Sequence, residues 1–146
     1  MIKIKIKVNT PISRMVFKSM KGKPGEATAT TFRRSIHLQG RTAEEFVLND
    51  TFLRHELQHA IQHQGIKVFS LKYIIETIKK GYSKNKYEVD AEINKTQPFP
   101  KGYLLYTDDL LCLKKEDYPF TIDNLTAINA HFGLKFKKMP KLILKA

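Results

Sequence analysis

The first residues of the chain alternate apolar and basic side chains, with isoleucine or valine at every even position and lysine at every odd position from residue 2 to residue 8. A period of two is typical of a β-strand with one buried face. Residues 27–38, rich in Thr, Phe and Ile, also predict a strand. Residues 11–18 are a further candidate element, and residues 21–25 have turn chemistry. The N-terminal part is therefore expected to form a small, mostly antiparallel sheet.

The pattern changes to helical spacing in residues 41–64, which contain no Gly or Pro. Two starting points for this helix are open. Thr42 and Glu45 have the spacing of a capping box, whereas Asn49 or Asp50 would cap a shorter helix. Either start leaves residues 55–59 in the middle of the helix.

Two more helices are predicted downstream. Residues 67–80 carry an apolar stripe at helical spacing that predicts a buried face, and Gly81 ends it. A third helix is expected to start near Ser83 or Asn85 and to stop before Pro98.

The C-terminal third is expected to be a structural scaffold for the rest of the chain. Residues 103–113 are apolar around Asp108 and Asp109, which favours a hairpin, and residues 121–131 favour a helix ended by Gly133. The basic segment 134–146 is left unassigned. The whole chain, 1–146, is expected to be one domain of the α+β class.

Residues 55–59 read His-Glu-Leu-Gln-His, an H-E-x-x-H motif on the predicted helix. Residues four apart on a helix share one face, so His55 and His59 can both offer a ring nitrogen to one metal ion at about 2.0–2.1 Å. Glu56 stands beside the first histidine and can act as a general base without being a ligand. This arrangement is typical of zinc-dependent hydrolysis.

A third protein ligand is required, and its position separates the classes of zinc hydrolase. Gln62 and Gly65 exclude the extended metzincin pattern, and His63 lies about 12 Å along the axis from the first histidine, too far to share the ion. Glu88 and Glu92 lie four apart on the third helix. The first can complete a His₂Glu site, and the second can accept the free ring N–H of a ligand histidine. Asp90 is expected on the opposite, solvent-facing side.

H-E-L-Q-H followed by E-V-D-A-E resembles gluzincin-type metallopeptidases, and residues 35–92 are similar to small bacterial and phage zincin-like proteins. The resemblance implies one Zn²⁺ bound by His55, His59 and Glu88, with Glu56 as the catalytic base. It also implies a zincin-like fold in which residues 35–39 form the strand edge that lines the cleft and pairs with substrate. Glu92 departs from the Asp more usual at its position. An oxyanion donor is also expected, and the sequence offers four tyrosines, namely Tyr82, Tyr87, Tyr103 and Tyr106.

Composition sets the outer limits. The formal net charge of +12 is uneven: residues 1–41 hold 10 basic residues and 1 acidic residue, residues 42–123 hold 11 and 13, and residues 124–146 hold 5 and 0. The segment that carries the motif is thus nearly neutral, between basic ends that could recruit a polyanion or nucleic acid. The single cysteine, Cys112, lies in an apolar run and is expected to be buried.

The sequence contains no signal-peptide pattern and no apolar stretch long enough for a membrane span, so we expect a cytoplasmic or virion-associated protein that acts without a membrane. The function predicted is that of a zinc metallopeptidase, a hydrolase acting on peptides or proteins. Two alternatives stay open: a non-catalytic structural or assembly protein with the zincin fold, such as a phage component, and a basic nucleic-acid-binding protein with a zincin core. The natural substrate and the oligomeric state do not follow from the sequence.

Overall fold

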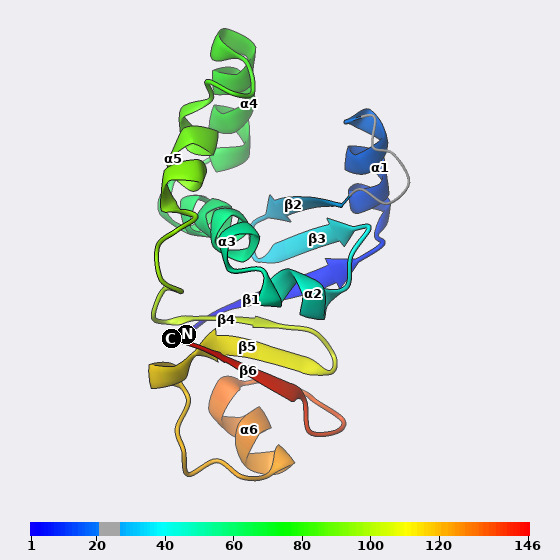
Figure 1. Cartoon of the computed structure of the whole chain (residues 1–146), viewed down its shortest axis with the longest axis vertical. Coiled ribbons are helices and arrows are strands. Elements are labelled where there is room, and N and C mark those ends of the chain that lie inside the picture. Colours follow the sequence, from blue (N-terminus) through cyan, green and yellow to red (C-terminus); the bar gives the residue numbers. More distant parts are fainter. Residues whose placement is uncertain (21–26) are drawn as a thin grey trace. The chain divides into compact units, whose positions relative to one another are not determined.

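The structure is a computed structural model that describes residues 1–20 and 27–146. The described residues form two compact units, Lys7–Gln97 and a second unit made of Met1–Ile6 with Pro98–Ala146. Helices and strands occur in both, which confirms the predicted α+β class (Figure 1). The expected turn at residues 21–25 lies outside the described residues. None of the helices in the described part of the chain is both long and apolar enough to cross a membrane.

The smaller unit is a sheet covered by one helix. Its strands follow the order β1-β4-β5-β6, with β1 parallel to β4, β4 antiparallel to β5 and β5 parallel to β6. The predicted hairpin is confirmed, and the unassigned basic segment supplies the outer strand. The elements are β1 (Ile2–Val8), β4 (Tyr103–Tyr106), β5 (Leu110–Lys114), the short 3₁₀ helix η1 (Lys115–Asp117), α6 (Leu125–Phe132) and β6 (Lys141–Lys145).

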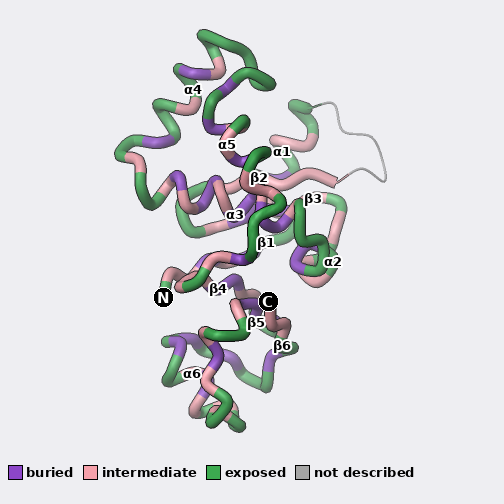
Figure 2. Tube along the Cα trace, turned by 60° about the vertical axis from the view of Figure 1, so that its left-hand side comes forward, coloured by how far each residue is buried: buried purple, intermediate pink, exposed green. Residues whose placement is uncertain are grey.

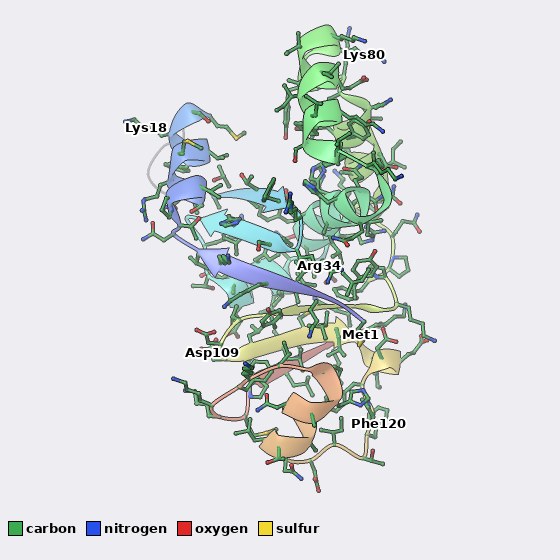
Figure 3. The ribbon with its side chains drawn as sticks, turned by 180° about the vertical axis from the view of Figure 1, so that it is seen from behind. Met1, Lys18, Arg34, Lys80, Asp109 and Phe120 are labelled. Carbon is green, nitrogen blue, oxygen red and sulfur yellow. The ribbon has the colours of Figure 1, made fainter. Side chains whose placement is uncertain are left out.

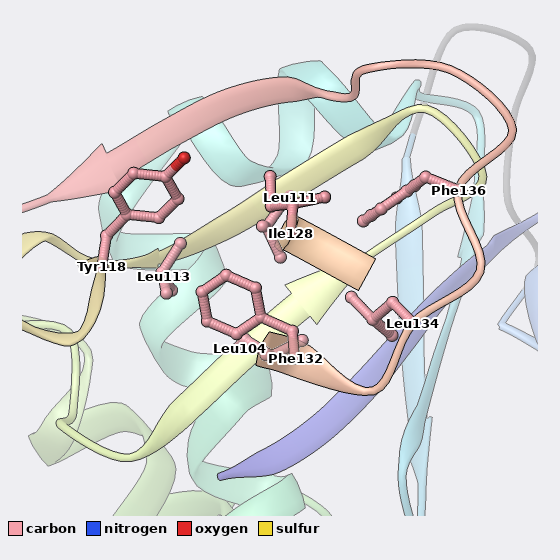
Figure 4. Close-up of a cluster of buried hydrophobic side chains, with 8 residues drawn as sticks. All are labelled: Leu104, Leu111, Leu113, Tyr118, Ile128, Phe132, Leu134 and Phe136. Carbon is pink, nitrogen blue, oxygen red and sulfur yellow. The ribbon is translucent and has the colours of Figure 1, made fainter. Parts of the chain in front are cut away.

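Apolar side chains hold this unit together. Residues from β4, β5 and α6 interlock in one cluster with those of the loop that follows the helix (Figure 4). Gly133 ends α6 with a φ of 63°, a conformation that favours glycine, and its carbonyl accepts a hydrogen bond from Lys3 Nζ at 3.1 Å. Cys112 is buried, as expected. The cluster consists of Leu104, Leu111, Leu113, Tyr118, Ile128, Phe132, Leu134 and Phe136.

In its described residues, the larger unit combines a β-hairpin with five helices. Its elements are α1 (Pro11–Ser19), β2 (Thr28–Phe32), β3 (Ser35–Gln39), α2 (Ala43–Leu48), α3 (Asp50–Gly65), α4 (Phe69–Lys80) and α5 (Lys86–Asn94). The single strand predicted over residues 27–38 is wrong, because the chain reverses at Arg33, which has a φ of 54°. Among the described strands, β2 lies at one end of the strand order, so it is an edge strand, and Ser35–Gln39 is not the edge that was expected.

The helix predicted over residues 41–64 is in fact two helices, and each of the two predicted starts is the N-cap of one of them. Thr42 caps α2 by accepting a hydrogen bond from the amide of Glu45, and Asn49 caps α3 by accepting one from the amide of Phe52. Asn85 is the N-cap of α5, which settles the open choice for the third helix. The helix is interrupted at Asn49, and the 16-residue α3 begins there with its own N-cap.

The predicted buried stripe of α4 is largely wrong. Phe69 is buried, but the other apolar residues of the stripe are exposed, with Ile78 79 % exposed. Exposed positions alternate with few buried ones along α4 (Figure 2). Phe69, Tyr73 and Glu76 form the face that turns inward instead, at the spacing i, i+4 and i+7. Many side chains of the helix therefore extend away from the fold, up to Lys80 at its end (Figure 3). The exposed members are Val68, Leu71, Ile74, Ile75 and Ile78.

Candidate metal centre

Helix α3 presents two histidines on one face. Leu53, Leu57 and Ala60 are nearly inaccessible to solvent and anchor the helix in the unit. This packing fixes the rotation of α3 and directs the rings of His55 and His59 toward α5, with their centroids 5.1 Å apart. The helical spacing expected from the sequence is therefore present in the structure.

Glu88 on α5 brings a carboxylate between the two rings. Its Oε2 lies 3.3 Å from His55 Nε2, and its Oε1 lies 3.1 Å from His59 Nε2. The three ligand atoms all lie within 4.8 Å of one another. Ligands of a tetrahedral zinc ion with bonds of about 2.0–2.1 Å are separated by about 3.3 Å, so this donor set fits a small divalent ion. Among the described residues, this is the group that meets the geometry of a metal site.

Glu92 lies one turn further along α5, and its Oε2 is 3.2 Å from His55 Nδ1. It also forms an ion pair with Lys95 and is half exposed. The structure thus places a carboxylate next to the ring nitrogen of His55 that faces away from the triad. A carboxylate in this position holds the ring so that Nε2 faces the metal position.

Glu56 is buried beside the triad, and only 6 % of it is exposed. Thr31 Oγ1 on β2 donates a hydrogen bond to Glu56 Oε2 at 2.9 Å and lies 3.2 Å from the Glu56 backbone oxygen. Burial raises the pKa of the Glu56 carboxyl, although the positive charges of His59 and His55 and the hydrogen bond from Thr31 oppose that rise. Glu56 is therefore a fixed carboxyl group whose proton affinity is increased.

The triad itself is an ion-pair cluster in the absence of metal. Burial lowers the pKa of His59, but the hydrogen bond to Glu88 and the negative charges of Glu56 and Glu88 outweigh it and raise that pKa to about 9. The hydrogen bond to Glu88 also raises the pKa of His55. Burial would raise the pKa of Glu88, yet the hydrogen bonds to both histidines lower it well below its usual range. A metal ion binding here has to displace protons from the histidines.

A pocket of about 310 Å³ opens beside the triad. Glu56, His59 and Glu88 line it with twelve other residues, and half of these are apolar residues of α1 and its C-cap, β2 and α4. A second pocket of about 310 Å³ is lined by His55, Glu92 and their neighbours. Tyr82 and Glu88 line both pockets. The apolar members of the first wall are Val16, Met20, Ala29, Phe32, Phe69 and Ile74.

Of the four tyrosines considered as oxyanion donors, Tyr82 lies at the pocket. Burial and the negative charge of Glu88 raise its pKa above its usual range, so its hydroxyl keeps its proton. The ring of Tyr87 is buried and stacks on that of Tyr73, with centroids 6.4 Å apart. Tyr103 and Tyr106 lie on β4 in the other unit.

Three groups at the site were not predicted from the sequence. Thr31 holds Glu56, Tyr73 donates a hydrogen bond to Glu88 Oε1 at 2.7 Å, and Gln62 Oε1 lies 2.9 Å from His59 Nδ1. The position of Gln62, one turn after His59 on the same helix, is a signal that sequence reasoning could have used. The partners of Thr31 and Tyr73 are distant along the chain, and no local pattern indicates them.

Asp90 and His63 complete the surroundings. The expected solvent-facing position of Asp90 is wrong, because its Oδ2 accepts hydrogen bonds from Gln58 and Gln62 on α3. His63 stays outside the triad, as expected. Its ring packs between Phe32 and Phe69, its Nε2 lies 3.3 Å from the Thr31 carbonyl oxygen, and burial lowers its pKa.

The comparisons with known proteins give one match. Residues 19–67, about a third of the chain, match the family model of the eCIS core domain. The matched segment contains the H-E-x-x-H motif and ends before α5, so it leaves out Glu88 and Glu92. No curated protein and no solved structure matches the chain. In its motif-bearing third, the chain is thus similar to the eCIS core domain.

Proposed function

We propose that His55, His59 and Glu88 hold one divalent metal ion, and that this ion is zinc. The observation that supports this most directly is the convergence of two imidazole nitrogens and one carboxylate at separations of 3.1 and 3.3 Å. Two neutral imidazoles and a carboxylate are a common zinc donor set that leaves a fourth position open. Glu92 and Gln62, which contact the two Nδ1 atoms, support this use of both Nε2 atoms.

We further propose that the centre hydrolyses peptide bonds, as in the gluzincin-type enzymes that the motif resembles. A bound zinc ion supplies Lewis-acid activation of water and of the scissile carbonyl. Glu56 accepts the proton of the attacking water and passes it to the leaving amine. Its raised pKa and its hydrogen bond from Thr31 suit both steps. Tyr82, with its protonated hydroxyl at the pocket, is the candidate donor to the oxyanion.

The surroundings suggest which peptides would bind. β2 is an edge strand along the pocket, so an extended chain can pair with backbone groups on its outer side. Apolar side chains from α1 and its C-cap, β2 and α4 line part of the pocket. We therefore expect a substrate segment in extended form with a large apolar side chain next to the cleaved bond.

A second candidate is supported by the family match. The eCIS core domain is named for extracellular contractile injection systems, which are phage-like assemblies. In this alternative the chain is an assembly component of such a system, and the metal ion fixes α3 to α5 without turnover. The match favours this role more directly than it favours catalysis, since a donor triad serves a structural ion equally well.

One experiment separates these functions. The purified protein and Glu56→Gln are compared for zinc content by mass spectrometry and for hydrolysis of a peptide library with varied apolar residues. The peptidase function predicts one zinc in both proteins and a loss of hydrolysis of about 10²–10⁴-fold in the variant. Stoichiometric zinc with no hydrolysis by either protein would favour the assembly component. Absence of bound zinc at saturating concentration would contradict the site itself.

A further inference from the structure

The two histidines of the triad are held differently. His55 Nδ1 lies near the carboxylate of Glu92, whose side chain is 56 % exposed. His59 Nδ1 instead lies 2.9 Å from the amide oxygen of Gln62, which is 5 % exposed. A neutral amide can present either its oxygen or its nitrogen, so something must determine which end faces His59.

The opposite end of Gln62 decides the orientation. Its Nε2 lies 2.9 Å from the Tyr87 carbonyl oxygen and 2.9 Å from Asp90 Oδ2. A backbone carbonyl can only accept hydrogen bonds, so the amide nitrogen has to face Tyr87 and Asp90. The amide oxygen is then left for His59. Because this oxygen is an acceptor, it favours a proton on Nδ1 and leaves Nε2 free for a ligand role.

We propose that Asp90 and Gln62 form a positioning relay that sets the tautomer of His59 for metal binding. Asp90 and the Tyr87 carbonyl orient the amide of Gln62, and Gln62 orients the ring of His59. The relay crosses from α5 to α3, so it also couples metal affinity to the packing of these two helices. It rests on the proposed metal site but not on catalysis, and it holds for a structural ion as well as for a hydrolytic one.

The chain offers a matched control for Gln62. Gln58 lies one turn earlier on α3 and donates to the same Oδ2 of Asp90 at 2.8 Å. Its other polar contact runs to Arg54, with 2.9 Å between Arg54 Nη1 and Gln58 Oε1. Gln62→Leu and Gln58→Leu each remove one donor to Asp90, and Gln62→Leu alone removes the acceptor at His59. A general loss of helix packing would affect both variants, whereas loss of the relay affects one.

The test measures the zinc dissociation constant by chelator competition and the His59 ring resonances by ¹⁵N NMR in the zinc-loaded protein. We expect Gln62→Leu to weaken zinc binding by about 10–100-fold and to lose the slowly exchanging Nδ1–H signal of His59. Gln58→Leu should keep the zinc dissociation constant within about twofold of the wild-type value and should retain the His59 signal. Equal weakening by the two variants, or an unchanged His59 signal in Gln62→Leu, would overturn the relay.

Asp90→Ala tests the first step of the relay. It should weaken zinc binding in the wild-type background and have no further effect in Gln62→Leu, because Asp90 acts through Gln62. Additive losses in the double variant would show that Asp90 acts independently, which contradicts the proposal. If the wild-type protein does not bind zinc, the proposed site fails, and that result is distinct from a relay failure in a protein that does bind it.

Discussion

The two compact units differ in the kinds of side chain that they bury. The unit of Pro98–Ala146 with Met1–Ile6 has a core made of aliphatic and aromatic side chains. Among the described residues, every buried polar or charged side chain lies in Lys7–Gln97, and the set comprises Ser13, His37, Arg54, Glu56, His59, Gln62, Glu76 and Asn85. Buried polar groups lower stability unless each has a partner. One unit is therefore organised for stability, whereas the other accepts less favourable burial in order to hold a site.

The same contrast explains how the polar residues are arranged. Glu56 is paired with Thr31, His59 with Glu88 and Gln62, and these partners come from β2, α5 and α3. The network is satisfied only when the three elements are together, so it specifies their arrangement. Loss of a single partner leaves a buried group unpaired, whereas loss of an apolar side chain in the other unit leaves a cavity. The predictions below use this difference.

The largest effect is expected for His59→Ala. The variant removes one of two imidazoles from the site, and the remaining pair should not retain zinc at stoichiometric level. His63→Ala is the matched control, because His63 lies one turn further on α3 and outside the triad. Zinc content after dialysis against metal-free buffer gives the measurement. Full occupancy in His59→Ala, or equal loss in His63→Ala, would mean that the ligand set is wrong.

The next effect concerns the smaller unit, whose core is apolar. Ile128 on α6 is fully buried, so Ile128→Ala should lower the free energy of unfolding by about 2–5 kcal/mol through lost burial and a cavity. The zinc dissociation constant should stay unchanged, since the proposed ligands lie in the other unit. Denaturant unfolding and chelator competition measure the two quantities. A parallel loss of zinc affinity would show that the units are energetically coupled.

Much of the fold could be predicted from the sequence where the determining forces are local. Helical spacing placed His55 and His59 on one face, Asn49 and Asn85 marked helix starts, and alternation predicted β1. The approach of Glu88 to both histidines was expected from the resemblance of the two motifs to gluzincins, and the structure brings these three side chains together.

Other features depend on contacts that no local pattern records. Arg33 adopts a left-handed conformation without a glycine or asparagine to indicate it, so the β2–β3 turn was missed. The apolar stripe of α4 satisfied every local criterion for burial, yet the helix turns its Phe69–Tyr73–Glu76 face inward. The parallel pairing of β5 with β6 joins residues about 30 positions apart, and the short apolar run of β6 between two lysines gives little indication of its neighbour.

The third effect is a dependence of metal binding on pH. The pKa of His59 is raised to about 9 from an unfolded value of about 6.5. The metal-free protein therefore gains stability from protonated His59 below about pH 6.5 and loses it as the pH rises through 9. Zinc affinity should change in the opposite direction, rising over this range by up to about tenfold per pH unit for each displaced proton. Glu88 stays ionised throughout, because its pKa is lowered.

Melting temperatures of the metal-free protein and zinc dissociation constants at pH 6 to 9 test this opposition. The smaller unit provides an internal reference. The unfolding of its core, followed by a spectroscopic signal from the stacked rings of Tyr118 and Phe132, should change little with pH. A zinc affinity that is constant between pH 6 and 9 would contradict proton competition at the histidines. A metal-free protein that becomes more stable toward pH 9 would contradict the ion-pair cluster.

The smallest effect is expected for Thr31→Val, which keeps the β-branched shape on β2 and removes the hydroxyl that donates to Glu56. That hydrogen bond lowers the pKa of the Glu56 carboxyl, so its loss should raise this pKa further. The acidic limb of the pH–rate profile for peptide hydrolysis should therefore move to higher pH, with zinc content and the plateau rate nearly unchanged. Thr30→Val, at the next position on the same strand, should leave the limb in place, because successive side chains of a strand point to opposite faces. If the acidic limb moved equally in both variants, or to lower pH in Thr31→Val, it would not report the protonation of Glu56.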